Sequence, residues 1–284
     1  MLHTLPVAQP FDFRQTLAFM RRFAPCRDAC LLTAESVTAA ISVAGEAVPF
    51  AIRAPRPGEI TVEAPDATVA AHARDFIGAG DDLAPLYAAA AEDPPFAAVV
   101  ETLHGLHHVR FLTLEEIAVY CVLMQRSPIA LAARMKVKFL ARFGRPVRAF
   151  GVALAAMPEM SALLELDEDA IADAIGHRRK AAMIVEVVRG VAALGEAFLR
   201  TAPYTVARDA LLAIRGIGPF SAAAILLRGL GRMDELPWSA AFDAAGEQVY
   251  GAAFSRAAIE RRYGRHVGYW SFYVRTSGAR SARM

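Results

Sequence analysis

The pattern of apolar and polar positions divides the chain into two parts, and short segments of β-type composition lie in the first hundred residues. Turn-forming residues separate these segments, notably Gly45-Glu46 and the cluster Pro55-Arg56-Pro57-Gly58, as expected for strands joined by tight turns. The predicted strands are Ala29–Ala34, Ala39–Val43, Pro49–Arg53 and Glu59–Ala64. Helices are predicted on either side of them, over Phe11–Arg22 and Ala67–Phe76. This part of the chain therefore predicts a small α+β unit that ends near residue 88.

From Asp93-Pro94-Pro95 onward, the apolar positions follow a helical pattern to the end of the chain. Thr113 and Glu116 form a capping box at the start of an apolar-rich helix. Ser127 and Pro128 mark the next helix, as its N-cap and its first helical residue. The predicted helices are Leu114–Arg126, Pro128–Phe143, Asp167–Ile175 and His177–Leu194. We therefore predict an α+β domain over residues 1–88, followed by an all-α domain over residues 89–284.

Composition narrows the class of protein. The chain has 284 residues, of which 55% are hydrophobic and 21% are charged, and this composition excludes a disordered chain. The three cysteines, Cys26, Cys30 and Cys121, exclude a secreted disulfide scaffold and favour a reducing compartment. No apolar run is long enough to span a bilayer, and the first ten residues lack the pattern of a signal peptide. We expect a soluble, cytoplasmic protein that does not bind membranes.

The net charge of +2 hides an asymmetry along the chain. Residues 1–100 contain 7 basic and 12 acidic residues, a net charge of −5. The other residues contain 24 basic and 17 acidic residues, a net charge of +7. A basic second part is compatible with a polyanionic partner, although this charge alone is weak evidence for one.

The most informative segment is Asp209–Gly231, in which two apolar helices flank the turn Gly216-Ile217-Gly218. Glycine permits a tight turn and leaves no side chain to obstruct the backbone of a ligand. The backbone N–H groups around Gly216–Phe220, at the positive end of the second helix, can hold a phosphate. Ile217 would fill the cleft between the helices. The alternative is an ordinary helical hairpin with a glycine turn.

This hairpin and several other segments resemble the helix-hairpin-helix DNA glycosylase superfamily, and within it the 3-methyladenine DNA glycosylase II (AlkA-type) branch. The segments that carry the resemblance are Gln9–Phe13, Gln125, His177–Ala181, Gly216–Ala222, Gly231–Pro237 and Arg265–Trp270. The hairpin alone occurs in many DNA-binding proteins, whereas the ordered set is far more specific. The resemblance implies a mainly α protein with a TATA-binding-protein-like N-terminal domain and an all-α glycosylase domain.

The resemblance also implies an activity. Such enzymes flip a damaged base out of duplex DNA and hydrolyse its N-glycosidic bond, which the base stack otherwise protects. The implied role is base-excision repair of alkylated purines by a nucleoid-associated monomer that requires no metal or other cofactor. An iron–sulfur cluster, as in the endonuclease III branch, needs four clustered cysteines, and the chain has three.

The family places its catalytic Asp where this sequence has Ser239. The nearest substitute is Asp243, one helical turn further on, although an acid in the first turn of a helix capped by Ser239 is also a common structural feature. Asp234 matches a loop acid that the family does not use for chemistry. With no Lys near Ser239 to form a Schiff base, we expect a monofunctional glycosylase. The alternatives are a non-catalytic protein that binds damaged DNA on the same scaffold and, less favoured, a protein-interaction module.

The resemblance implies two groups of contact residues. Gln125 matches the Gln of a loop that probes the minor groove, and Arg126 occupies the wedge position beside it, where it would fill the flipped-out gap or bind phosphate. The candidate DNA-binding residues are Gln125, Arg126, Gly216, Ile217, Gly218, Phe220 and Ser221. The candidate base-pocket residues are Phe220, Trp238, Tyr269 and Trp270, for each of which core packing is an equal alternative.

Three histidines, His104, His107 and His108, lie close together in the sequence. No acid or cysteine stands at a spacing that would complete a metal site with them. We therefore expect a solvated helix end there and no metal.

Overall fold

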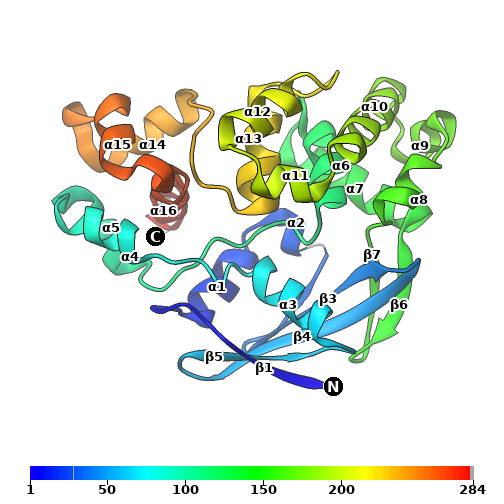
Figure 1. The fold of residues 1–284 in the computed structure, drawn as a ribbon, viewed down its shortest axis with the longest axis horizontal. Coiled ribbons are helices and arrows are strands. Elements are labelled where there is room, and N and C mark those ends of the chain that lie inside the picture. The colour runs from blue at the N-terminus through cyan, green and yellow to red at the C-terminus, as the bar shows by residue number, and fades with distance from the viewer. Residues whose placement is uncertain (28, 282–284) are drawn as a thin grey trace.

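The computed structural model describes residues 1–27 and 29–281. Helices make up most of the molecule, and an antiparallel sheet of five strands forms one side of it (Figure 1). This architecture confirms the prediction of a mainly α protein with a small α+β part at its N-terminus. In these ranges no helix is both long and apolar enough to cross a membrane.

The sheet has the strand order β1-β5-β4-β3-β2, and every neighbouring pair is antiparallel. Its strands are β1 Leu2–Pro6, β2 Leu31–Leu32, β3 Ser36–Val43, β4 Glu46–Arg56 and β5 Glu59–Glu63. The turn Ala44-Gly45 joins β3 to β4, and both of its residues have positive φ, as a two-residue hairpin turn requires. Strand β1 was not predicted from the sequence, whereas the other strands lie where turn formers bounded β-type segments.

Three helices belong to the sheet part of the chain: α1 (Phe13–Met20), α2 (Ala24–Arg27) and α3 (Ala67–Phe76). Asp12 and Asp66 cap α1 and α3 by accepting backbone N–H groups. Apolar side chains of α1 and α3 form one hydrophobic core with the sheet strands. These caps explain why both helices begin close to their predicted starts.

The other helices form two groups with separate apolar cores. The first group contains α6 (Leu114–Met124), α7 (Ile129–Phe143), α8 (Met160–Leu164), α9 (Glu168–Ile175), α10 (Arg178–Leu194), α11 (Glu196–Thr201), α12 (Tyr204–Leu212), α13 (Pro219–Ala224) and the π-helical turn η1 (Ile225–Gly229). The second contains α4 (Ala84–Ala91), α5 (Pro94–Thr102), α14 (Ala240–Tyr250), η2 (Gly251–Ala253), α15 (Arg256–Tyr263), η3 (Gly264–His266) and α16 (Val267–Ser281). Helices α4 and α5 lie beside the C-terminal helices (Figure 1). The division at residue 88, inside α4, stays a prediction.

The prediction of continuous helix after Asp93-Pro94-Pro95 is wrong at one place. Residues Arg145–Ala149 and Val152–Ala156 form an antiparallel hairpin, β6–β7. Its turn is Phe150-Gly151, and both residues have positive φ, 52° and 77°. The hairpin packs against β3 and β4. Tertiary contact with the sheet therefore gives this short segment a strand partner that its composition alone did not indicate.

A buried ion pair joins α6 to α7. Lys136 pairs with Glu116, and their side chains are 3% and 4% exposed. The Lys136 ammonium also donates a hydrogen bond to the carbonyl of Pro25, at 3.2 Å. Glu116 accepts a hydrogen bond from the N–H of Leu112, and Thr113 caps the helix as predicted. This network connects the α+β part of the chain to the helices that carry the candidate site.

Candidate functional site

The glycine turn joins α12 to α13 in a helical hairpin. Gly216 has φ +95°, so its backbone conformation disfavours any residue with a side chain. Gly218 instead has φ −101°, which any residue adopts, and a Cβ added there would meet no atom within 4 Å. Ile217 is 6% exposed and belongs to the apolar core, as expected for a plug between the helices. Gly216 is therefore needed for the turn, and Gly218 keeps its surface open.

The start of α13 presents some of the predicted contact residues and buries another. Phe220 is 53% exposed, and Gly218 is exposed beside it. Ser221 is buried, at 4% exposure. An approaching strand of DNA would therefore meet Phe220 and the backbone of the turn, whereas Ser221 packs inside.

Gln125 is bonded directly to this turn. Its side-chain amide donates a hydrogen bond of 2.7 Å to the carbonyl of Gly216, 91 residues away in sequence. Lys180 holds the same loop from the other side, because its ammonium donates to the carbonyls of Val122, Leu123 and Gln125 at 2.7–2.9 Å. A cation at the C-terminus of a helix satisfies its last carbonyls and its dipole. Burial lowers the pKa of Lys180. The sequence placed Lys180 in a family motif but did not predict this contact.

Arg126 follows Gln125 and is exposed. Its φ is +51°, a left-handed conformation that is uncommon for residues other than glycine, asparagine and aspartate. Such strained residues concentrate at functional sites. The loop after α6 therefore presents Arg126 outward beside the hairpin, as a wedge or a phosphate contact would require.

Ser239 stands at the N-cap of α14, but its side chain makes no capping hydrogen bond. Asp243, one turn further on, forms a two-pronged ion pair with Arg256, in which the Nε–Oδ1 distance is 2.6 Å. The hydrogen bonds from Arg256, more than its charge alone, lower the pKa of Asp243. Both candidates thus lie at the start of one helix, and the carboxylate of Asp243 is already engaged.

The aromatic candidates lie at three different depths. Tyr269 and Trp270 are 3% and 1% exposed, and the Tyr269 hydroxyl donates a hydrogen bond to Asp81. Trp238 is half-buried, with its ring 5.8 Å from that of Trp270 and its indole N–H bonded to Glu260. The structure brings Trp238 and Trp270 together, whereas Phe220 lies exposed on the hairpin. Tyr269 and Trp270 therefore lie in the core, and Trp238 is the aromatic residue nearest to Ser239 in the sequence.

The expectation of a solvated helix end holds for His104, which is exposed in the turn after α5, but it is wrong for the other two histidines. His107 and His108 are fully buried. His107 is held by the carbonyls of Gly78 and Pro10, at 2.7 and 2.8 Å, because its segment crosses between the sheet and the helices. His104 stacks on Tyr87 at 5.4 Å. Among the residues described, no group of three or more potential ligand residues could hold a metal.

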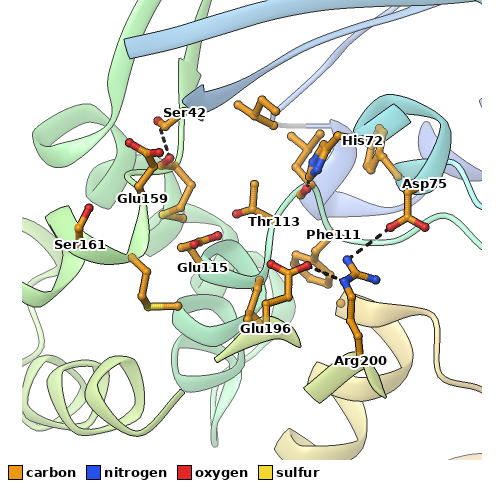
Figure 2. Close-up of a pocket in the computed structure, with 17 residues that line it drawn as sticks. Ser42, His72, Asp75, Phe111, Thr113, Glu115, Glu159, Ser161, Glu196 and Arg200 are labelled. Atoms are coloured by element: carbon orange, nitrogen blue, oxygen red, sulfur yellow. Dashed lines mark hydrogen bonds and ion pairs between the residues drawn. The ribbon is translucent and has the colours of Figure 1, made fainter. Parts of the chain in front are cut away.

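A cavity of about 390 Å³ lies between the sheet part and the first helical group, and it was not predicted from the sequence. Figure 2 shows Glu115, Glu159 and Glu196 around it. Glu159 accepts the N–H groups of the β3–β4 turn, and Arg200 links Glu196 to Asp75. The first turn of α6 lines the cavity. Gln125 follows the last turn of the same helix, about 16 Å further along the helix axis at a rise of 1.5 Å per residue. It is therefore separate from the hairpin.

No family model matches the chain. Over 173 residues it is 29% identical to a protein of Mycobacterium tuberculosis named probable bifunctional transcriptional activator/DNA repair enzyme AlkA, covering 61% of this chain and 34% of the relative. Over 152 residues it is 28% identical to the DNA-3-methyladenine glycosylase of Bacillus subtilis, covering 53% of this chain and 50% of the relative. The matched segments thus span a third to a half of these relatives.

Solved structures share the fold over nearly the whole chain. The 3-methyladenine DNA-glycosylase from Archaeoglobus fulgidus has a TM-score of 0.81 at 19% identity, covering 96% of this chain and 97% of that one. The 8-oxoguanine glycosylase/lyase of Clostridium acetobutylicum, solved with double-stranded DNA, has a TM-score of 0.74 at 13% identity, covering 100% and 99%. The chain therefore has the fold of these DNA glycosylases, and over part of its length its sequence is similar to proteins named AlkA and DNA-3-methyladenine glycosylase.

Proposed function

We propose that the protein is a DNA glycosylase of base-excision repair that hydrolyses the N-glycosidic bond of alkylated purines in duplex DNA. The observation that carries this proposal is the hydrogen bond from Gln125 to Gly216. It joins the loop that would probe the minor groove to the turn that would hold the backbone phosphate. One rigid unit can therefore hold the strand while Arg126 fills the gap of a flipped base. The proposed partner is duplex DNA with a damaged base, bound by a monomer.

The lysines support a monofunctional enzyme. A glycosylase that also cleaves the strand needs an amine to attack the sugar. The chain has three lysines, of which Lys136 is ion-paired and Lys180 is bound to three carbonyls. Lys138 is exposed on α7, outside the hairpin and α14. Water would therefore be the nucleophile.

A second candidate function is recognition of damaged DNA without base release. It is favoured by Ser239 at the position of the family's Asp, and by the ion pair that neutralises Asp243. A serine can hold a water molecule, but it supplies no charge to stabilise an oxocarbenium-like transition state.

Gly216→Asp should abolish most duplex binding, because it places a side chain and a negative charge where the phosphate would approach. Binding of the wild type should weaken with salt, with a slope of about −0.9 per neutralised phosphate in a plot of log affinity against log salt. Gly58→Asp is the matched control, since Gly58 also has positive φ, lies in open space and belongs to the turn between β4 and β5 rather than to the helical hairpin. Fluorescence titration at several salt concentrations measures both. Salt-independent binding that survives Gly216→Asp would refute a DNA partner held by the hairpin.

Arg126→Ala distinguishes a wedge from a phosphate contact. If Arg126 enters the base stack, the variant should lose its preference for an abasic or mismatched site while binding intact duplex nearly as before. A phosphate contact carries no information about the base, so its loss would weaken both complexes equally. Titration of the variant against the two duplexes gives the answer, and equal losses would exclude the wedge.

A further inference from the structure

The chain between α6 and α8 is rich in cations and contains no acid. Between Glu116 and Glu159 the sequence has seven Lys and Arg residues and no Asp or Glu. One of the seven, Lys136, is buried in its ion pair with Glu116. The other six are exposed: Arg126, Arg134, Lys138, Arg142, Arg145 and Arg148. The last five of these form a basic surface on α7 and β6, which we call the α7–β6 surface.

The cations of the α7–β6 surface have no carboxylate to neutralise them. Within residues 1–27 and 29–281, none of these side chains forms an ion pair. Other exposed arginines of the chain do pair with acids, as Arg178 does with Asp169 and Arg189 with Glu186. A continuous surface of uncompensated positive charge is typical of a surface that binds a polyanion.

The spacing of these cations along α7 is unfavourable for the helix by itself. Arg134, Lys138 and Arg142 follow one another at intervals of four residues, so their side chains lie on one face of α7. Like charges at this spacing destabilise a helix. An anion bound along this face would remove the repulsion. The arrangement therefore costs stability in the free protein and is favourable only in a complex.

Helix α7 runs from the candidate DNA site toward the sheet. It begins three residues after Arg126, in the loop that Gln125 bonds to the turn of the helical hairpin. Its other end leads into β6, and the hairpin β6–β7 packs against β3 and β4. The helix has 15 residues and is therefore about 22 Å long, the length of about six base pairs of duplex.

We propose that the α7–β6 surface binds the phosphate backbone of the duplex on one side of the lesion. This inference rests on the proposed function and adds a second contact region to the hairpin. A duplex that meets Arg126 at the lesion would place its flanking backbone along the cations of α7. Contacts to phosphate carry no sequence information, but they fix the register of a protein on its duplex. The α7–β6 surface would thus hold the flanking duplex while Arg126 tests the base stack.

Apolar residues on the same helix raise a second possibility. Ile129 and Val137 are 62% and 50% exposed, and a helix that presents both cations and apolar side chains also suits an anionic lipid surface. The duplex is favoured, because the cations continue from Arg126 and from the loop that is bonded to the hairpin turn. Binding to lipid is therefore an outcome that the experiment has to exclude.

The triple variant Arg134→Gln/Lys138→Gln/Arg142→Gln removes the charges on the exposed face of α7. Glutamine is a good helix former, and the substitution also removes the repulsion between like charges. The variant should therefore unfold at the same temperature as the wild type or at a higher one. A loss of affinity together with unchanged or increased stability would separate a binding role of these residues from a structural one.

The matched control removes the same charge elsewhere. Arg14→Gln/Arg53→Gln/Arg56→Gln replaces three exposed arginines of the α+β part. Both variants and the wild type are titrated with three duplexes that each carry one abasic site. One duplex extends about ten base pairs on both sides of the site, and the other two have a short arm of about three base pairs on one side or the other, which is less than the length of α7. Fluorescence titration at several salt concentrations gives the affinity and its salt dependence.

We expect the triple variant to bind the symmetric duplex about tenfold or more weakly than the wild type at low salt. The slope of log affinity against log salt should become shallower by about 3, or about 1 for each lost phosphate contact. With the two asymmetric duplexes, the loss should appear for only one position of the long arm. The control variant should keep the affinity of the wild type for all three duplexes.

Equal losses on both asymmetric duplexes would indicate general electrostatic attraction and overturn the proposal, as would no loss on any duplex. Vesicles of phosphatidylglycerol test the lipid alternative. Wild-type binding to these vesicles that is lost in the triple variant, with duplex affinity unchanged, would also overturn the proposal. A wild type that binds none of the duplexes would refute the proposed function, and this inference with it.

Discussion

Ser239→Asp should raise the single-turnover rate of base release from a damaged duplex by about a hundredfold or more, the usual effect of one preorganised electrostatic group. The new carboxylate would stand at the family's catalytic position, at the uncapped start of α14. A charge that acts on the transition state changes turnover more than ground-state affinity, so binding should change little.

Asp243→Asn is the companion to this experiment, and it asks whether Asp243 replaces the missing carboxylate. Arg256 already neutralises Asp243, and we therefore expect the rate of base release to stay close to that of the wild type. A hundredfold loss of release with intact binding would identify Asp243 as the catalytic acid. No gain from Ser239→Asp on any lesion would show that the rest of the site is unfit for catalysis.

Lys136→Met should lower the free energy of unfolding by about 3–5 kcal/mol, the range for breaking a buried ion pair. The variant leaves the carboxylate of Glu116 buried without its cation, and it also removes the hydrogen bond to the carbonyl of Pro25. Urea unfolding followed by circular dichroism measures the loss. The double variant Lys136→Met/Glu116→Gln should recover part of it, because no uncompensated charge remains.

An exposed ion pair serves as the control for the buried pair of Lys136 and Glu116. Arg178 and Asp169 pair at 2.7 Å, but their side chains are 75% and 66% exposed. Arg178→Met should therefore cost no more than about 1 kcal/mol. If both variants lost the same small free energy, the network around Lys136 would not hold the α+β part to α6 and α7.

Local chemistry made much of the fold predictable. The capping residue Thr113 marked the start of α6, and turn-forming glycines marked the β3–β4 turn and the helical hairpin. In each case a few neighbouring residues determine the backbone. The hairpin β6–β7 was not predictable in this way, because its strands are stabilised by contact with a sheet formed a hundred residues earlier.

Residues of the candidate site could be predicted only where a single short segment of the chain determines their conformation. The turn at Gly216 and the exposed loop at Arg126 are local features, and the sequence indicated both. The burial of His107 depends on carbonyls contributed by two distant segments. Likewise, Arg228 lies over the rings of Phe19 and Phe23, two hundred residues earlier in the chain, which no spacing in the sequence reveals.

Release of the free base tests the central claim most directly. Single-lesion duplexes are incubated with excess protein, the released base is quantified by mass spectrometry, and the strand is analysed before and after alkali. A glycosylase predicts the free damaged base together with a strand that is cleaved at the lesion only after alkali, since abasic sites are alkali-labile. Tight binding of the damaged duplex with no base released from any lesion would contradict the enzyme and leave a damage-binding protein.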